Sequence, residues 1–136
     1  MVDLNLRELS APLRALKPEV KEAFDRLNAK WKAVVAELKK ITIPCDISHT
    51  YCENIRSPEQ CHSLEWRKWR GKRRFCITYY DVDFDPQLGH EQTMDVTPYE
   101  EWSAEQRLEM LDHVPAFFET AVKQIQEFVA KTQEDS

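Results

Sequence analysis

Cysteine and histidine side chains gathered between residues 45 and 62 could carry metal or thiol chemistry. They are Cys45, His49, Cys52, Cys61 and His62. Thiolate and imidazole groups bind zinc, usually from two pairs of residues that lie two to four positions apart. Cys45 with His49 and Cys61 with His62 do not form two such pairs. The sequence therefore favours no bound metal and no cofactor, and its weak candidate ligands are Cys45, His49, Cys52 and Cys61.

The same stretch gives thin support for catalysis. A cysteine nucleophile needs a positioned base and an orienting group, and no local signature joins Cys52 or Cys61 to His49 or His62. The chain has only two glycines, so it has no glycine-rich phosphate loop of the Walker or dinucleotide kind. We expect a non-enzymatic protein, and a thiol- or metal-dependent enzyme in the 45–62 loop is the weakest of three hypotheses.

A basic run that contains a tryptophan is the most specific signal in the chain. Between Trp66 and Arg74 there are six basic residues and no acidic one. Aromatic and arginine anchors dominate binding energy at protein interfaces, whereas the same residue types also suit phosphate contacts and base stacking. A third reading is a solvated tip whose charges prevent strands from associating at their edges. The predicted partner-binding residues are Arg67, Trp69, Arg70, Lys72, Arg73 and Arg74.

An acidic segment follows the basic run directly. From Phe75 to Gln106 the chain has no lysine or arginine and eight acids, which are Asp81, Asp83, Asp85, Glu91, Asp95, Glu100, Glu101 and Glu105. Basic charge can thus be neutralised inside the molecule or across a self-associating interface. The net charge of −5 gives no reason to expect nucleic acid over the whole surface. We expect a protein partner of acidic character or self-association, with nucleic acid as the alternative.

The basic run is predicted to lie on a β-hairpin over residues 64–80. A two-residue turn at Arg70-Gly71 places a glycine where such turns need a positive φ. Pairing outward from this turn sets Trp69 opposite Lys72 and Trp66 opposite Phe75, and directly opposed residues share a face. One face then carries Leu64, Trp66, Phe75, Ile77 and Tyr79. The other carries Glu65, Arg67, Trp69, Arg74, Thr78 and Tyr80.

Helical patterns flank the strand region on both sides. Leucines at positions 6, 9, 13 and 16 predict a short helix, capped by Ser10 with Pro12 in its first turn. Pro18 begins a longer helix with a heptad stripe from Val20 to Leu38. A second stripe, from Leu108 to Val129, predicts a C-terminal helix that Pro115 kinks or divides.

Between the helices, alternation over 41–48 predicts a strand, 49–62 a loop and 92–96 a short fourth strand. Capping boxes are predicted at 97–100 and 103–106. Helices at both ends of a block of strands indicate an α+β fold, with an antiparallel sheet of three or four strands and helices packed on one sheet face. A length of 136 residues fits one domain, with frayed ends at about 1–3 and 132–136.

No apolar run approaches the ~20 residues that span a bilayer, and the N-terminus lacks a secretory signal. We therefore expect a cytoplasmic protein with reduced cysteines and no membrane partner. The function that the sequence favours is a small cytosolic protein-interaction or adaptor protein, which uses the basic and aromatic face of the 64–80 hairpin. The alternative is a nucleic-acid-binding module that uses the same hairpin.

Overall fold

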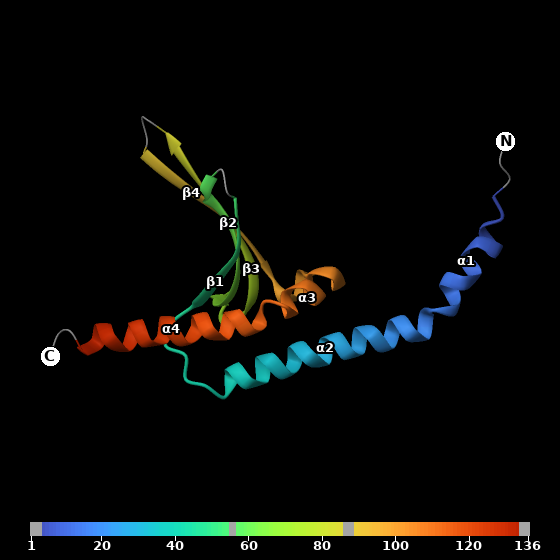
Figure 1. The fold of residues 1–136 in the computed structure, drawn as a ribbon, viewed down its shortest axis with the longest axis horizontal. Coiled ribbons are helices and arrows are strands. Elements are labelled where there is room, and N and C mark those ends of the chain that lie inside the picture. The colour runs from blue at the N-terminus through green and yellow to red at the C-terminus, as the bar shows by residue number, and fades with distance from the viewer. Residues whose placement is uncertain (1–3, 55–56, 86–88, 134–136) are drawn as a thin grey trace. The chain divides into compact units, whose positions relative to one another are not determined.

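Four α-helices and one antiparallel four-stranded sheet make up the described residues, which are 4–54, 57–85 and 89–133 of a computed structural model (Figure 1). The predicted α+β class is confirmed. The chain divides into two units, residues 1–40 and residues 41–136. The prediction of one domain stays a prediction. None of the helices in the described ranges is both long and apolar enough to cross a membrane.

The first unit consists of α1 (Leu6–Ala15) and α2 (Lys17–Lys39). The predicted Ser10 cap is wrong, because the side chain of Asn5 accepts from the backbone N–H of Glu8 at 3.3 Å and starts the helix earlier. Pro12 therefore lies inside α1, whereas Pro18 lies in the first turn of α2 as predicted. The α1 leucines are largely exposed; Leu13, for example, is 71% exposed.

The sheet of the second unit has the order β1-β2-β3-β4. Its strands are β1 (Ile47–Asn54), β2 (Ser57–Trp69), β3 (Lys72–Asp85) and β4 (Gly89–Pro98). The predicted hairpin register is confirmed from the Trp69–Lys72 pair to the Leu64–Ile77 pair. The turn is also confirmed, because Arg70 and Gly71 have φ values of 52° and 94°.

Two predictions about the region before the hairpin are wrong. Residues 41–46 form no strand, and most of β1 and the first part of β2 occupy the stretch predicted as a loop at 49–62. Pro44 has no N–H to give to a sheet ladder, and Ile41 is 49% exposed. The β1–β2 ladder begins instead at Ile47, which is fully buried opposite Trp66. Polar side chains on both faces of 48–54 hid this strand from a search for apolar alternation.

The C-terminal helical region begins at Ser103, whose side chain forms the predicted capping box with Gln106. The box predicted at 97–100 is wrong, because a 3₁₀ turn, η1 (Tyr99–Glu101), follows Pro98 without a side-chain cap. The predicted division of the last helix is confirmed. α3 (Ala104–Leu111) ends before α4 (Val114–Gln133) begins, so that Pro115 lies in a first turn, where it is tolerated.

The core of this unit lies between α4 and one face of the sheet (Figure 1). The buried Phe117 of α4 packs edge-on against Phe75, which packs in turn against Trp66, at centroid distances of 5.4 and 5.1 Å. The Gln124 side chain adds a two-way hydrogen bond to the backbone of Ser48, at 3.1 and 2.8 Å. Trp66 and Phe75 are buried as predicted.

One core position and two surface positions are intermediate in burial. Ile77, which was predicted to be buried, is only half-buried because it borders a cavity. Arg67 and Trp69 lie on the sheet face opposite Trp66, as the register requires. Both are half-buried rather than fully exposed.

Candidate functional site

Three arginines of the predicted partner-binding set already have acidic partners inside the molecule. Arg67 Nη1 lies 3.0 Å from Glu65, and Arg74 Nη1 lies 3.3 Å from Glu100. Arg73 Nη1 lies 3.4 Å from Asp46 and also donates to the backbone carbonyl of Cys45 at 3.0 Å. The side chains of these arginines are only 18–20% exposed. Arg73 and Arg74 cross-link the hairpin to neighbouring segments, and Arg67 forms an ion pair within it.

The other basic residues of the run form an exposed group, which we call the hairpin tip: Lys68, Arg70 and Lys72, together with Trp69. The three basic residues are exposed, and none of them has an ion pair within the described part of the chain. The guanidinium carbons of Arg67 and Arg70 lie 5.6 and 5.9 Å from the centroid of the Trp69 ring, within cation–π range. The tip is therefore a cationic surface built around one indole.

Three hydrogen-bond donors beside the tip have no acceptor among the described atoms. They are Nε of Arg67, Nε1 of Trp69 and Nε of Arg74, and each is inaccessible to solvent. Arg67 and Arg74 are directly opposed across the hairpin, and Trp69 is on the same face. Buried donors in folded proteins are normally paired. The face thus has more donors than acceptors.

A buried carboxylate organises the same face of the sheet. Glu65 is 3% exposed and accepts hydrogen bonds from Thr78 Oγ1 and Tyr80 OH, each at 2.6 Å. Arg67 supplies the compensating charge at 3.0 Å. Burial and the Glu65 hydrogen bond raise the pKa of Tyr80, so its hydroxyl remains a donor. The register places Glu65, Thr78 and Tyr80 on one face; what the sequence does not reveal is that Glu65 and Thr78 are buried there.

The candidate metal ligands do not assemble into a site. Cys45 precedes β1, His49 and Cys52 lie on β1, and Cys61 on β2 is paired with Tyr80. Among the side chains that the structure describes, no three His, Cys, Asp or Glu residues are placed to hold a metal ion. His49 Nδ1 is instead hydrogen-bonded to Thr120 Oγ1 at 2.7 Å, and burial and the charge of His113 lower its pKa. The β1–β2 pairing sets Cys52 directly opposite His62, whereas His49 is paired further along the strands with Leu64.

All four cysteines are free thiols: Cys45, Cys52, Cys61 and Cys76. Cys76 is fully buried on the Glu65 face of the sheet. Burial raises the pKa of its thiol to about 11, so it stays protonated near neutral pH. It acts as a small apolar residue of the sheet interior.

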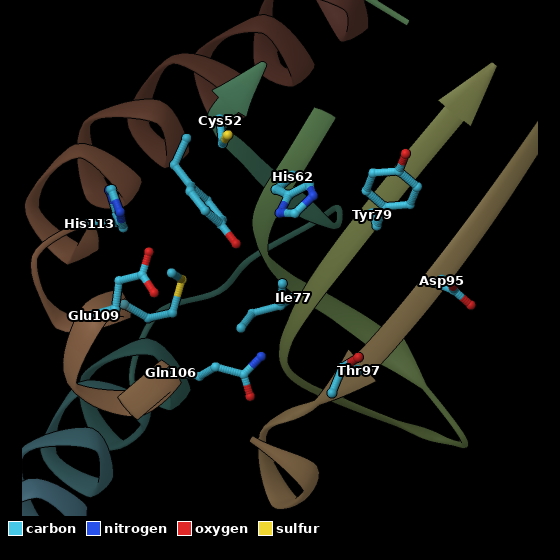
Figure 2. A pocket seen from close by; sticks show the side chains of 11 residues that line it. Cys52, His62, Ile77, Tyr79, Asp95, Thr97, Gln106, Glu109 and His113 are labelled. Atoms are coloured by element: carbon cyan, nitrogen blue, oxygen red, sulfur yellow. The ribbon is translucent and has the colours of Figure 1, made fainter. Parts of the chain in front are cut away.

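A cavity of about 740 Å³ opens on the helix-bearing face of the sheet (Figure 2). Strand residues form one side of it, and residues of α3 and of the α3–α4 junction form the other. The sequence does not reveal this cavity, because its lining comes from segments far apart in the chain. The lining residues are Tyr51, Cys52, His62, Ile77, Tyr79, Asp95, Thr97, Gln106, Glu109, Met110 and His113.

Four rings in contact line the cavity. Tyr51 stacks on His113 at a centroid distance of 4.7 Å and meets the edge of His62 at 6.2 Å. His62 in turn meets Tyr79 at 5.0 Å. Burial, followed by the negative charge of Glu109, raises the pKa of Tyr51 to about 12. The hydroxyl of Tyr51 is therefore neutral at physiological pH.

Comparison of the chain with protein-family models, with curated proteins and with solved structures found no match.

Proposed function

We propose that this protein acts as a non-enzymatic interaction or adaptor protein, which binds an acidic segment of another protein through the hairpin tip. One observation carries the proposal. Arg70 lies exposed at the turn in a left-handed conformation, beside Trp69, and has no acidic partner within the described residues. Trp69 is the aromatic anchor of this surface, and Arg70 and Lys72 are its charged groups.

The backbone conformation of Arg70 supports a functional reading of the tip. A left-handed φ costs a non-glycine residue roughly 1–2 kcal/mol, and asparagine tolerates it better than arginine. Two-residue turns with positive φ at both positions prefer Asn-Gly or Asp-Gly. A residue that violates a local rule is expected most often at a functional site. Compared with asparagine, arginine adds a positive charge and a guanidinium group with several N–H donors at this position.

The unpaired donors beside the tip point to an acceptor-rich partner. Carboxylate oxygens accept hydrogen bonds from guanidinium and indole N–H groups, and charge-assisted hydrogen bonds are the stronger kind. Arg67 Nε, Trp69 Nε1 and Arg74 Nε lack acceptors in the described structure. A carboxylate brought to this face by a partner would supply acceptors of the kind that these donors lack.

A protein partner fits the tip better than a nucleic acid does. Nucleic-acid binding draws its affinity from many phosphate contacts, but Arg67, Arg73 and Arg74 are already paired with Glu65, Asp46 and Glu100. These three carboxylates would also repel a phosphate backbone. A surface with few unpaired charges and one aromatic anchor is instead typical of a protein interface, where a few residues carry most of the binding energy.

The test measures fluorescence polarisation of a labelled glutamate-rich peptide and of a labelled single-stranded DNA of equal length. The tip variant carries Arg70→Glu and Lys72→Glu. Its matched control carries Lys30→Glu and Lys32→Glu, two equally exposed positions on α2. The proposal predicts that the wild-type protein and the control bind the peptide and that the tip variant loses binding.

Two results would contradict the proposal. One is equal peptide binding by the tip variant and the control, since binding would then reflect net charge alone. The other is tighter binding of DNA than of peptide, with an affinity that falls steeply as salt is added. For a single strand, the logarithm of the binding constant should fall with the logarithm of the salt concentration by a slope of about −0.7 per phosphate contact. That result would favour the nucleic-acid alternative.

A further inference from the structure

The cavity of Figure 2 has the size and construction of a small-molecule site. Its volume of about 740 Å³ lies within the range of roughly 300–1,000 Å³ that is typical of ligand pockets. Ile77 and Met110 supply apolar surface, and hydroxyl and amide groups of Thr97 and Gln106 supply polar contacts. A mostly apolar surface with a few polar groups is how such pockets select and orient a ligand.

The aromatic lining favours a cation. His113, Tyr51, His62 and Tyr79 contact one another in that order along the cavity, at centroid distances of 4.7, 6.2 and 5.0 Å. The faces of aromatic rings carry negative electrostatic potential, which attracts ammonium groups, and cages of aromatic side chains recognise organic ammonium ions in other proteins. Tyrosine hydroxyls at the rim can also accept a hydrogen bond from a protonated amine.

The charges of the lining favour the same class of ligand. Asp95 and Glu109 contribute carboxylates, and the lining contains no lysine and no arginine. The surrounding sequence adds to this field, because residues 75–106 contain eight acids and no basic residue. Carboxylates on a concave surface concentrate cations there. Anionic ligands such as phosphates are correspondingly disfavoured.

We propose that this cavity binds an organic ammonium ion, with the charged nitrogen held against the aromatic wall beside the carboxylate of Glu109. A bare metal ion fits less well, because the described side chains offer no group of three suitable ligands. The site lies on the sheet face opposite Arg67 and Trp69, so it is separate from the proposed partner surface.

The test is methyl NMR of the whole chain, with benzyltrimethylammonium as the probe and benzyl alcohol and benzoate as the neutral and anionic controls. The signals to follow are the methyl groups of Ile77 and Met110, which both border the cavity. The ammonium probe should shift both signals in a saturable way, and the two controls should shift them far less. Equal shifts with benzoate, or no shift with the ammonium probe, would overturn the proposal.

Two variants test separately how the charge and the shape of the site contribute to binding of the probe. Glu109→Gln should weaken binding of the ammonium probe by about tenfold or more, because it removes a charge interaction inside the cavity. The matched control is Glu127→Gln, at an exposed α4 position outside the lining, which should leave the affinity unchanged. Tyr51→Phe keeps the ring and should keep binding. Unchanged affinity in Glu109→Gln, or loss of binding in the folded Tyr51→Phe variant, would contradict the proposed geometry.

Discussion

Glu65 stabilises the sheet face that lies opposite the apolar core, and it does so through polar contacts of its side chain. Its carboxylate accepts hydrogen bonds from Thr78 and Tyr80 and neutralises Arg67, with all four side chains on one face. Removing one partner of a buried ion pair leaves the other charge without compensation. The stability of the hairpin should therefore depend on this carboxylate more than on any exposed charge.

The first prediction is that Glu65→Ala lowers the free energy of unfolding by about 3–5 kcal/mol, because it removes a buried carboxylate that pairs with Arg67 and accepts hydrogen bonds from Thr78 and Tyr80. Urea denaturation measures this change. Glu100→Ala is the matched control, since the Glu100 side chain is 55% exposed in its pair with Arg74. An exposed pair contributes at most about 1 kcal/mol. Similar losses in the two variants would show that the Glu65 network is not the stabilising element.

Tyr51 gives a prediction about pH. Its pKa is raised to about 12, mainly by burial, whereas an unfolded tyrosine ionises near pH 10. Above about pH 10 the unfolded chain releases a proton that the folded chain keeps, so stability falls as pH rises. Tyr51→Phe should therefore lose less stability than the wild type between about pH 10 and pH 12. Equal losses in the two proteins would mean that Tyr51 ionises alike in both states.

At the scale of elements, the hairpin is the part of the fold that the sequence predicts best. Alternation of apolar and polar residues on both strands and a glycine at the turn require one register, because a slip by one residue would move Trp66 and Phe75 to the wrong face. The strand over 47–54 could not be predicted in the same way. Its burial depends on pairing with β2 and on contacts with α4, which are long-range interactions that a local pattern does not contain.

The two candidate sites also differ in how far the sequence predicts them. The basic run of the hairpin is local, so the sequence displayed all of its residues. It could not show that Arg67, Arg73 and Arg74 are paired with Glu65, Asp46 and Glu100, because two of these acids come from other segments. The cavity was missed altogether, since Tyr51 and His113 meet only after β1 and the α3–α4 junction come together.

The turn of the hairpin supplies a prediction that separates stability from binding. Arg70→Asn should raise the free energy of unfolding by roughly 0.5–1 kcal/mol, because asparagine relieves the left-handed strain. The same variant should weaken binding of the glutamate-rich peptide. Gly71→Ala is the control that should lower stability. A Cβ at this position would meet no atom within 4 Å, so any loss of stability comes from the φ of 94°. A stabilised Arg70→Asn variant with full peptide binding would remove Arg70 from the proposed surface.

At the scale of the whole molecule, the basic and acidic residues are unevenly distributed along the chain. The basic run at 67–74 is followed by an acidic segment, and only part of the basic charge is used in internal ion pairs. The remainder, at the hairpin tip, is available to a partner. Electrostatic attraction of this kind speeds association, while an aromatic anchor such as Trp69 slows dissociation.

Native mass spectrometry of the protein purified from its own cells tests this account most directly, because it gives the identity and the stoichiometry of a bound partner together. The account predicts a complex with an acidic protein, present for the wild type and for the Lys30→Glu, Lys32→Glu control. The complex should be absent for the folded Arg70→Glu, Lys72→Glu variant. A complex that persists in the tip variant, or a bound nucleic acid in place of a protein, would contradict the account.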